Sequence, residues 1–315
     1  QSGYFPGTAR ASLQKYYGDA GRGLVFPLRL AGTNQPDDYR ISSTGGFSRL
    51  NNERGLCGYA LNTSKGATLA IKTNPFFVSD NSFNKLSLLS SAPGVKPLLK
   101  VKDEQLQPKE ISLGEYQYSE ASWETAVSNI ELSLQGDGSH LYGMMLEKQQ
   151  PGLLFHATGI NGAGFYNLIG ASQLFTQISL LNPDLIVISL GTNDAQGNFK
   201  EKVFSANLEK FMAEFRGANP TTPVLFTLPP DSHKRGKHNQ DLGKVEKIII
   251  DYAKNNNCAW WDLSAVMGGK GSVIKWRKEQ MASKDLLHYT PKGYMLQGYL
   301  FYQALIKSYK AFSEK

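Results

Sequence analysis

Hydrophobic and polar positions alternate in two different ways along this chain. After residue 151, short apolar runs typical of buried strands are separated by segments with helical periodicity. The clearest run, residues 185–190, is rich in β-branched residues and is followed by Gly191, Thr192, Asn193 and Asp194. A strand–helix repeat of this kind predicts an α/β domain with a doubly wound parallel sheet.

The same patterns give the individual elements of this domain. The predicted strands are residues 153–156, 185–190, 224–228 and 259–263. The predicted helices are residues 8–17, 170–181, 204–215, 245–254 and 293–309. A helix is an unusual first element for such a sheet, so we expect a first strand upstream of Gln1 that is missing from this chain.

Residues 44–150 have a different pattern of apolar and polar residues. Short alternating runs lie between clusters of Gly, Asn, Ser and Pro, at residues 57–61, 68–72, 85–89, 98–101, 130–134 and 141–146. They predict an inserted all-β domain, a sandwich or jelly roll. The predicted organisation is therefore a discontinuous, flavodoxin-like α/β domain of residues 1–43 and 151–315, interrupted by a β domain of residues 44–150.

The number and distribution of the charged residues argue against some classes of function. The 315 residues carry a net charge of +7, but the basic residues are dispersed, and the densest group is His233–His238. Without zinc-finger spacing or an arginine-rich arm, we expect no nucleic-acid partner and favour a basic surface that attracts an anionic polymer. No apolar run is long enough to span a membrane.

The two cysteines, Cys57 and Cys258, are too few for a disulfide framework or a zinc site. Cys258 lies in an apolar run and is predicted to be a buried thiol, whereas pairing between the two cysteines stays open. We predict no metal and no organic cofactor.

The candidate catalytic residues lie in two short segments. Asn193 follows a predicted strand, where its amide could donate to a developing oxyanion, although Gly, Asn and Asp are also ordinary turn residues. In Asp285-x-x-His288, one turn of backbone brings a carboxylate beside an imidazole and can fix its tautomer; the alternative is an ordinary helix-entry loop. His156 is predicted to be a satisfied core residue, and His140 a turn residue.

In combination these segments indicate a protein family more specifically than either does alone. Gly159 after one strand, Gly191-x-Asn193-Asp194 after the next and Asp285-x-x-His288 before the last helix occur in this order. The set resembles the SGNH (GDSL) hydrolase superfamily. Further similarity lies in residues 17–23, 31–34, 159–163, 261–263 with 267–269, and 288–294, and it points to bacterial secreted peptidoglycan and polysaccharide O-acetylesterases.

The resemblance implies a role for each matching residue. Asn193 and the backbone N–H of Gly159 would be oxyanion donors, His288 the general base and Asp285 the residue that orients it. It also implies a secreted or periplasmic protein. The β insert is similar to the family only in its position in the chain and its general residue pattern. It would help to hold a glycan.

One expected part of the family pattern is absent. Such enzymes carry their nucleophile in an early Gly-Asp-Ser block after the first strand, so we expect this serine just upstream of Gln1. Three substitutes within the chain are less favoured: Ser2, the Gly136-Asp137-Gly138-Ser139-His140 segment, which reads as a hairpin turn, and Ser232. The leading hypothesis is a serine esterase that removes acyl groups, notably O-acetyl, from a carbohydrate polymer. The alternative is a catalytically inactive carbohydrate-binding or scaffold protein on a hydrolase frame.

Overall fold

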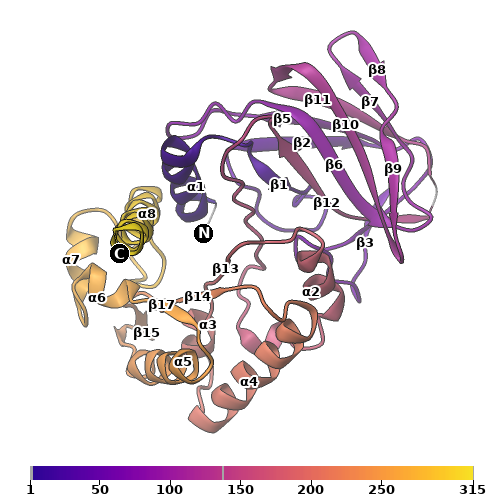
Figure 1. The fold of residues 1–315 in the computed structure, drawn as a ribbon. Helices are drawn as coiled ribbons and strands as arrows, with labels where there is room; N and C mark the ends of the chain where they lie inside the picture. The colour runs from indigo at the N-terminus through magenta and orange to yellow at the C-terminus, as the bar shows by residue number, and fades with distance from the viewer. Residues whose placement is uncertain (1–2, 137, 315) are drawn as a thin grey trace. The chain divides into compact units, whose positions relative to one another are not determined.

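The computed structural model describes residues 3–136 and 138–314. The chain forms two compact units, Ser2–Gly159 and Ile160–Lys315, which are considered separately (Figure 1).

The Ile160–Lys315 unit is built around a parallel sheet. Its strands are β13 (Ile186–Ile188), β14 (Val224–Thr227) and β17 (Ala259–Trp261), in the order β13-β14-β17. In this register Val187 lies opposite Leu225, and Phe226 lies opposite Trp260. All three strands are where the apolar runs predict them.

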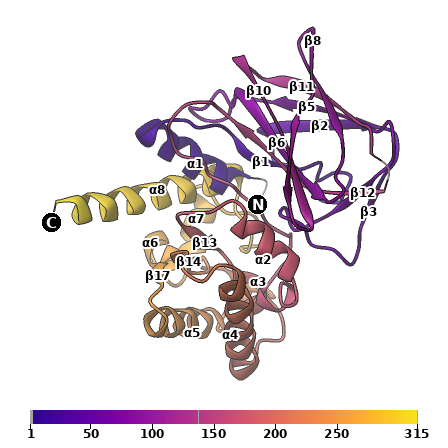
Figure 2. The ribbon, with the colours of Figure 1, turned by 45° about the vertical axis from the view of Figure 1, so that its right-hand side comes forward.

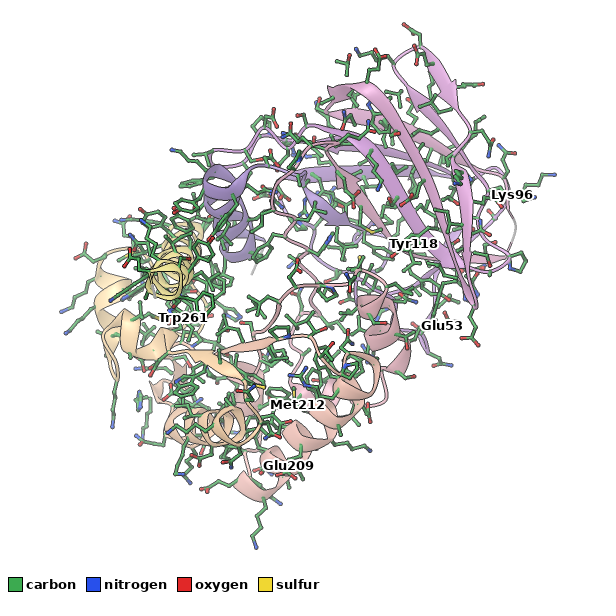
Figure 3. All side chains as sticks on the ribbon, viewed as in Figure 1. Glu53, Lys96, Tyr118, Glu209, Met212 and Trp261 are labelled. Atoms are coloured by element: carbon green, nitrogen blue, oxygen red, sulfur yellow. The ribbon has the colours of Figure 1, made fainter. Side chains whose placement is uncertain are left out.

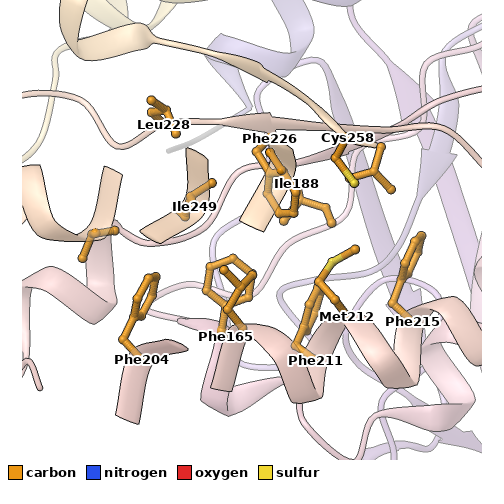
Figure 4. Close-up of a cluster of buried hydrophobic side chains, with 14 of the residues drawn as sticks. Phe165, Ile188, Phe204, Phe211, Met212, Phe215, Phe226, Leu228, Ile249 and Cys258 are labelled. Carbon is orange, nitrogen blue, oxygen red and sulfur yellow. The ribbon is translucent and has the colours of Figure 1, made fainter. Parts of the chain in front are cut away.

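Helices cover one face of this sheet through a continuous apolar core. The core combines side chains of β13 and β14 with those of α2 (Ser172–Ser179), α4 (Glu201–Ala218) and α5 (Leu242–Asn255) (Figure 4). The ring of Phe211 on α4 lies 5.2 Å from Phe165 and 5.3 Å from Phe175, in edge-to-face geometry. Burying an aromatic side chain of this size contributes about 2–3 kcal/mol, so this core fixes the sheet against the helices.

The opposite face is covered by α8 (Pro291–Ser313). The ring of Phe301 on α8 lies 5.1 Å from that of Trp261 on β17 (Figure 3 labels Trp261). The last turns of α8 extend past α6 (Leu263–Met267) and α7 (Ser272–Lys278) (Figure 2). Helices on both faces are what the doubly wound prediction requires.

The Ser2–Gly159 unit contains α1 (Tyr4–Tyr17) and two antiparallel sheets. The larger sheet has the order β3-β4-β12-β6-β10-β9, with β1 paired to β12, and the smaller one has the order β2-β5-β11-β7-β8. The larger sheet consists of β1 (Gly23–Val25), β3 (Phe47–Arg49), β4 (Leu61–Thr63), β6 (Phe83–Ser91), β9 (Lys109–Leu113), β10 (Tyr116–Val127) and β12 (Ser139–Glu147). The smaller sheet consists of β2 (Tyr39–Thr44), β5 (Thr68–Thr73), β7 (Pro97–Val101), β8 (Glu104–Leu106) and β11 (Asn129–Leu134).

Residues before position 44 contribute strands to these sheets. β1 pairs with β12, and β2 pairs with β5 over its full length. A buried ion-pair network supports this arrangement: Asp38 accepts from Arg10 at 2.9 Å and from Arg22 at 3.0 Å. The all-β pairing therefore begins earlier than residue 44, and the discontinuous α/β domain stays a prediction.

Two strand predictions are wrong. Residues 153–156 form only a single parallel bridge, between Leu153 and Asp19. The segment around Asp19 has glycines at positive φ on either side of it, at positions 18 and 21, so the pairing does not extend beyond this bridge. Residues 57–60 form no strand, and β4 begins only at Leu61.

Candidate active site

A closed loop carries Asp285 and His288 into helix α8. The N–H of Thr290 donates to the Met281 carbonyl at 3.0 Å, and the N–H of Ser283 donates to the His288 carbonyl at 2.8 Å. Thr290 caps α8 by accepting from the N–H of Gly293 at 3.3 Å, with Pro291 in the first turn. The loop is thus closed at its base and fixed to a helix.

Within this loop the carboxylate and the imidazole are in contact. Oδ2 of Asp285 lies 2.7 Å from Nδ1 of His288. Oδ1 of Asp285 accepts the backbone N–H groups of Leu287 and His288, both at 3.0 Å. Partial burial raises the pKa of Asp285, but these hydrogen bonds, led by that of the His288 side chain, outweigh it and lower the pKa below its usual value. An ionised Asp285 holds the proton on Nδ1, which leaves Nε2 of His288 able to accept a proton.

Asn193 lies at the start of α3 (Thr192–Gln196), directly after the end of β13. Gly191 makes the turn between them with φ +110°, where a Cβ would be 3.0 Å from Val245. Nδ2 of Asn193 donates to the Ala163 carbonyl at 2.9 Å, and the side chain is exposed. An amide has two N–H donors, so one remains for a ligand.

Asp194, which the sequence pattern includes without a role, is a structural residue of this region. Its carboxylate accepts the N–H of Phe165 at 3.2 Å, and a Cβ on Gly164 would lie 2.6 Å from the carboxylate. Burial raises the pKa of Asp194, while the backbone N–H groups lower it to a smaller extent. Asn193 and Asp194 together hold residues 163–165 against α3.

The element carrying Asn193 and the loop carrying His288 are both bonded to one segment, residues 231–239. The Ala195 carbonyl of α3 accepts from Nδ2 of Asn239 at 3.2 Å. The Leu286 carbonyl accepts from the N–H of His233 at 2.8 Å. Gly159 is the last residue of the Ser2–Gly159 unit, and its role as an oxyanion donor stays a prediction.

Two of the serines considered as substitute nucleophiles, Ser232 and Ser139, do not fit that role. Ser232 is fully buried, and its hydroxyl accepts from Gln196 at 3.3 Å. Ser139 is buried as the first residue of β12, and its Oγ donates to the Pro93 carbonyl at 3.5 Å. The prediction of a hairpin turn here is wrong, because β11 and β12 belong to different sheets and the segment between them connects the two. Ser2 and Asp137 lie outside the described residues.

The other histidines have separate environments. His140 lies within β12 rather than in a turn, with Nδ1 3.0 Å from Oε2 of Glu53. The prediction of a satisfied His156 is wrong: its buried Nδ1 has no partner among the described residues. Burial, and then the charge of Arg22, lower the pKa of His156 to about 4, so this ring is neutral at pH 7.

The two cysteines do not form a disulfide with each other. Cys57 and Cys258 are both free and buried, as predicted for Cys258. Over residues 3–136 and 138–314, no group of three or more His, Cys, Asp and Glu side chains could hold a metal ion. Over the same residues, no helix is both long and apolar enough to cross a membrane.

Comparison with solved structures supports the fold. A peptidoglycan O-acetylesterase aligns over 98% of this chain and 88% of its own chain, with a TM-score of 0.81 and 20% sequence identity. In sequence, an arylesterase of Vibrio mimicus is 31% identical over 105 residues, which are 30% of this chain and 52% of that protein. This chain therefore spans about half the length of the curated relative that it matches.

A family model gives the assignment. Residues 126–296 match the GDSL-like lipase/acylhydrolase family, and this range includes Asn193, Asp285 and His288. The match covers more than half of the chain, and it includes the sheet, the α3 turn and the loop before α8. The chain belongs to the GDSL-like lipase/acylhydrolase family.

Proposed function

We propose that the protein is a serine esterase that removes O-acetyl groups from a carbohydrate polymer such as peptidoglycan. The observation that carries the proposal is the 2.7 Å contact between Asp285 and His288, in a chain of an acylhydrolase family. The likeness to a peptidoglycan O-acetylesterase supports the substrate class. The net charge of +7 favours an anionic polymer.

The proposed mechanism is acyl transfer through a serine. Nε2 of His288 takes the serine proton as the hydroxyl attacks the ester carbonyl, while Asp285 stabilises the imidazolium. The amide of Asn193 and the N–H of Gly159 hold the tetrahedral oxyanion, each donor contributing about 3 kcal/mol. The oxyanion collapses and expels the sugar hydroxyl, which takes the proton from His288. Water then hydrolyses the acyl-enzyme with the same histidine as base.

The nucleophile is proposed to lie in a segment that precedes Gln1. Two observations support this. Within the described residues β13 pairs only with β14 and is an edge strand, and an edge strand can accept a further strand by backbone hydrogen bonding. Ser139 and Ser232 are buried, and their hydroxyls are hydrogen-bonded to other residues. A Gly-Asp-Ser sequence encoded before Gln1 is expected, and its absence would contradict this part of the proposal.

The remaining parts of the proposal concern the rest of the protein. The two antiparallel sheets of the Ser2–Gly159 unit are proposed to form a sandwich that helps to hold the glycan. A polymer of the cell wall or cell surface as substrate places the enzyme outside the cytoplasm, secreted or periplasmic.

The test is acetate release by the complete encoded protein. The wild type and a His288→Ala variant are compared on an aryl acetate and on an O-acetylated glycan. His140→Ala is the matched control, because His140 lies in the other unit with its own partner, Glu53. We expect loss of turnover only in His288→Ala. A wild type that binds the glycan without releasing acetate would support the inactive scaffold instead.

A further inference from the structure

A short hairpin in the Ile160–Lys315 unit is flanked on both sides by buried polar residues. β15 (His233–Lys234) and β16 (Lys237–His238) are joined by Arg235 and Gly236, both at positive φ, as a tight two-residue turn requires. Asp231 and Asn239, which flank the hairpin, are each only 1% exposed. Polar groups this deeply buried are retained where they are hydrogen-bonded, so their partners indicate what the hairpin does.

The first set of partners lies in the loop that carries His288. The hydroxyl of Tyr289 donates to the Asp231 carbonyl at 2.5 Å. The N–H of His233 donates to the Leu286 carbonyl at 2.8 Å. Burial, and then the charge of Asp231, raise the pKa of Tyr289, so its hydroxyl keeps the proton that it donates. The two bonds hold the loop on both sides of His288.

The second set of partners lies in α3, which carries Asn193. Nζ of Lys234 and Nδ2 of Asn239 donate to the Ala195 carbonyl at 2.9 and 3.2 Å. Nε2 of Gln196 donates in the opposite direction, to the His233 carbonyl at 3.0 Å. The hairpin is therefore bonded to the residues that directly follow Asn193.

The hairpin itself is anchored through the Asp231 carboxylate. Oδ2 accepts the N–H of Val273, in the first turn of α7, at 2.9 Å. Oδ1 lies 3.3 Å from Nδ1 of His238 on β16. These contacts fix the Asp231 backbone, whose carbonyl is the acceptor for Tyr289.

We infer that the segment from Asp231 to Asn239 is a brace that sets the imidazole of His288 relative to the amide of Asn193, with Tyr289 as its positioning residue on the His288 side. The inference rests on the proposed esterase function. Acyl transfer needs the base and the oxyanion donor in a fixed relation to one carbonyl, and a displacement of about 1 Å can lower the rate about 100-fold. Tyr289 acts through His288 and makes no contact with substrate in this scheme.

The experiment removes one bond on each side of the brace in the complete encoded protein. Tyr289→Phe removes the bond to the Asp231 carbonyl and keeps the ring packed against Trp276. Gln196→Ala removes a bond on the α3 side. Tyr252→Phe is the matched control, because Tyr252 lies on α5 and its ring packs on Phe226 instead. Hydrolysis of an aryl acetate gives kcat and KM, and proton NMR reports the hydrogen bond between His288 and Asp285.

We expect kcat to fall about tenfold in Tyr289→Phe and Gln196→Ala with KM within about twofold, and no change in Tyr252→Phe. The far-downfield His288 proton should shift or broaden in Tyr289→Phe and stay unchanged in Gln196→Ala. Folded Tyr289→Phe protein with unaltered kcat and an unaltered proton signal would overturn the inference. A wild type without esterase activity would contradict the proposed function alone, and the NMR comparison would still decide the role of Tyr289.

Discussion

The carbonyl oxygen of Met281 lies so close to Gly293 that a Cβ on Gly293 would be only 1.9 Å away from it. Both atoms belong to backbone, so neither can move like the end of a flexible side chain. A Gly293→Ala substitution must displace the first turn of α8 or the base of the Asp285–His288 loop. We expect the free energy of unfolding to fall by about 3 kcal/mol, measured by urea denaturation.

A second helical glycine provides the control. Gly217 lies near the end of α4 and has no atom within 4 Å of the position that its Cβ would take. Gly217→Ala should leave stability unchanged or raise it by about 0.5–1 kcal/mol, because alanine is the better helix former. Equal losses in the two variants would mean that the Met281 contact is not the cause.

Asp285→Asn tests the orientation of the imidazole. The asparagine side chain keeps the size of the carboxylate but loses the charge that stabilises the imidazolium and fixes the proton on Nδ1. We expect kcat for aryl acetate hydrolysis to fall about 10²–10⁴-fold in the complete encoded protein. Because Asp285 is half exposed, the free energy of unfolding at pH 7 should change by less than about 1 kcal/mol.

The matched control for Asp285→Asn is Asp251→Asn. Asp251 is also an exposed aspartate with a cationic partner, Lys247, but it lies on α5. Its substitution should leave kcat unchanged. An Asp285→Asn variant as active as the wild type would remove the carboxylate from the mechanism.

Asn193→Ala tests the oxyanion donor. If its free N–H stabilises the tetrahedral oxyanion, kcat should fall about 10²–10³-fold while KM changes little, since the ground-state ester makes a weaker bond. Steady-state kinetics on an aryl acetate measure both constants. Asn198→Ala is the control on the exposed segment after α3. Loss of stability without loss of kcat would show that Asn193 only holds the Ala163 carbonyl.

The parallel sheet was predictable because its strands are apolar on both faces. Residues 185–190 and 224–228 have no competing helical period, and β13 and β14 form within them. β10 was missed for the opposite reason. Its twelve residues, Tyr116–Val127, include two serines, a threonine and two glutamates, so no apolar run identifies the strand. It pairs with β9 through the turn of residues 114–115, but its pairing with β6 is a contact distant in sequence that local patterns do not encode.

The candidate site was predictable only where its members are close in sequence. Asp285 and His288 are three residues apart, so the sequence could suggest their contact. The bond between Tyr289 and the Asp231 carbonyl joins segments 58 residues apart, and its acceptor is a backbone atom. The sequence pattern shows neither the approach of the two segments nor which carbonyl accepts. Buried polar bracing of this kind depends on the tertiary structure.

Glu246, which lines a pocket beside the hairpin, should make the free energy of unfolding depend on pH. Glu246 on α5 lines a pocket of about 310 Å³ with Asp231, His238 and Asp262. Burial raises the pKa of Glu246 to about 7, with the charges of Asp262 and Asp231 adding to it and a hydrogen bond with Ser264 opposing it. The folded protein therefore holds a proton on Glu246 that the unfolded chain has released above its ordinary pKa, near 4.5.

As a result, the free energy of unfolding contributed by Glu246 should fall as pH rises from about 4.5 to about 7. Glu246→Gln removes this loss, so the variant should match the wild type near pH 4.5 and be more stable by up to about 2 kcal/mol near pH 8, after allowance for solvent screening. Urea denaturation across this range measures the difference. Glu209→Gln, at an exposed position on α4, should show no such trend. A difference between Glu246→Gln and the wild type that is constant with pH would mean that Glu246 is ionised in the folded protein throughout this range, and that the neighbouring carboxylates do not hold its proton.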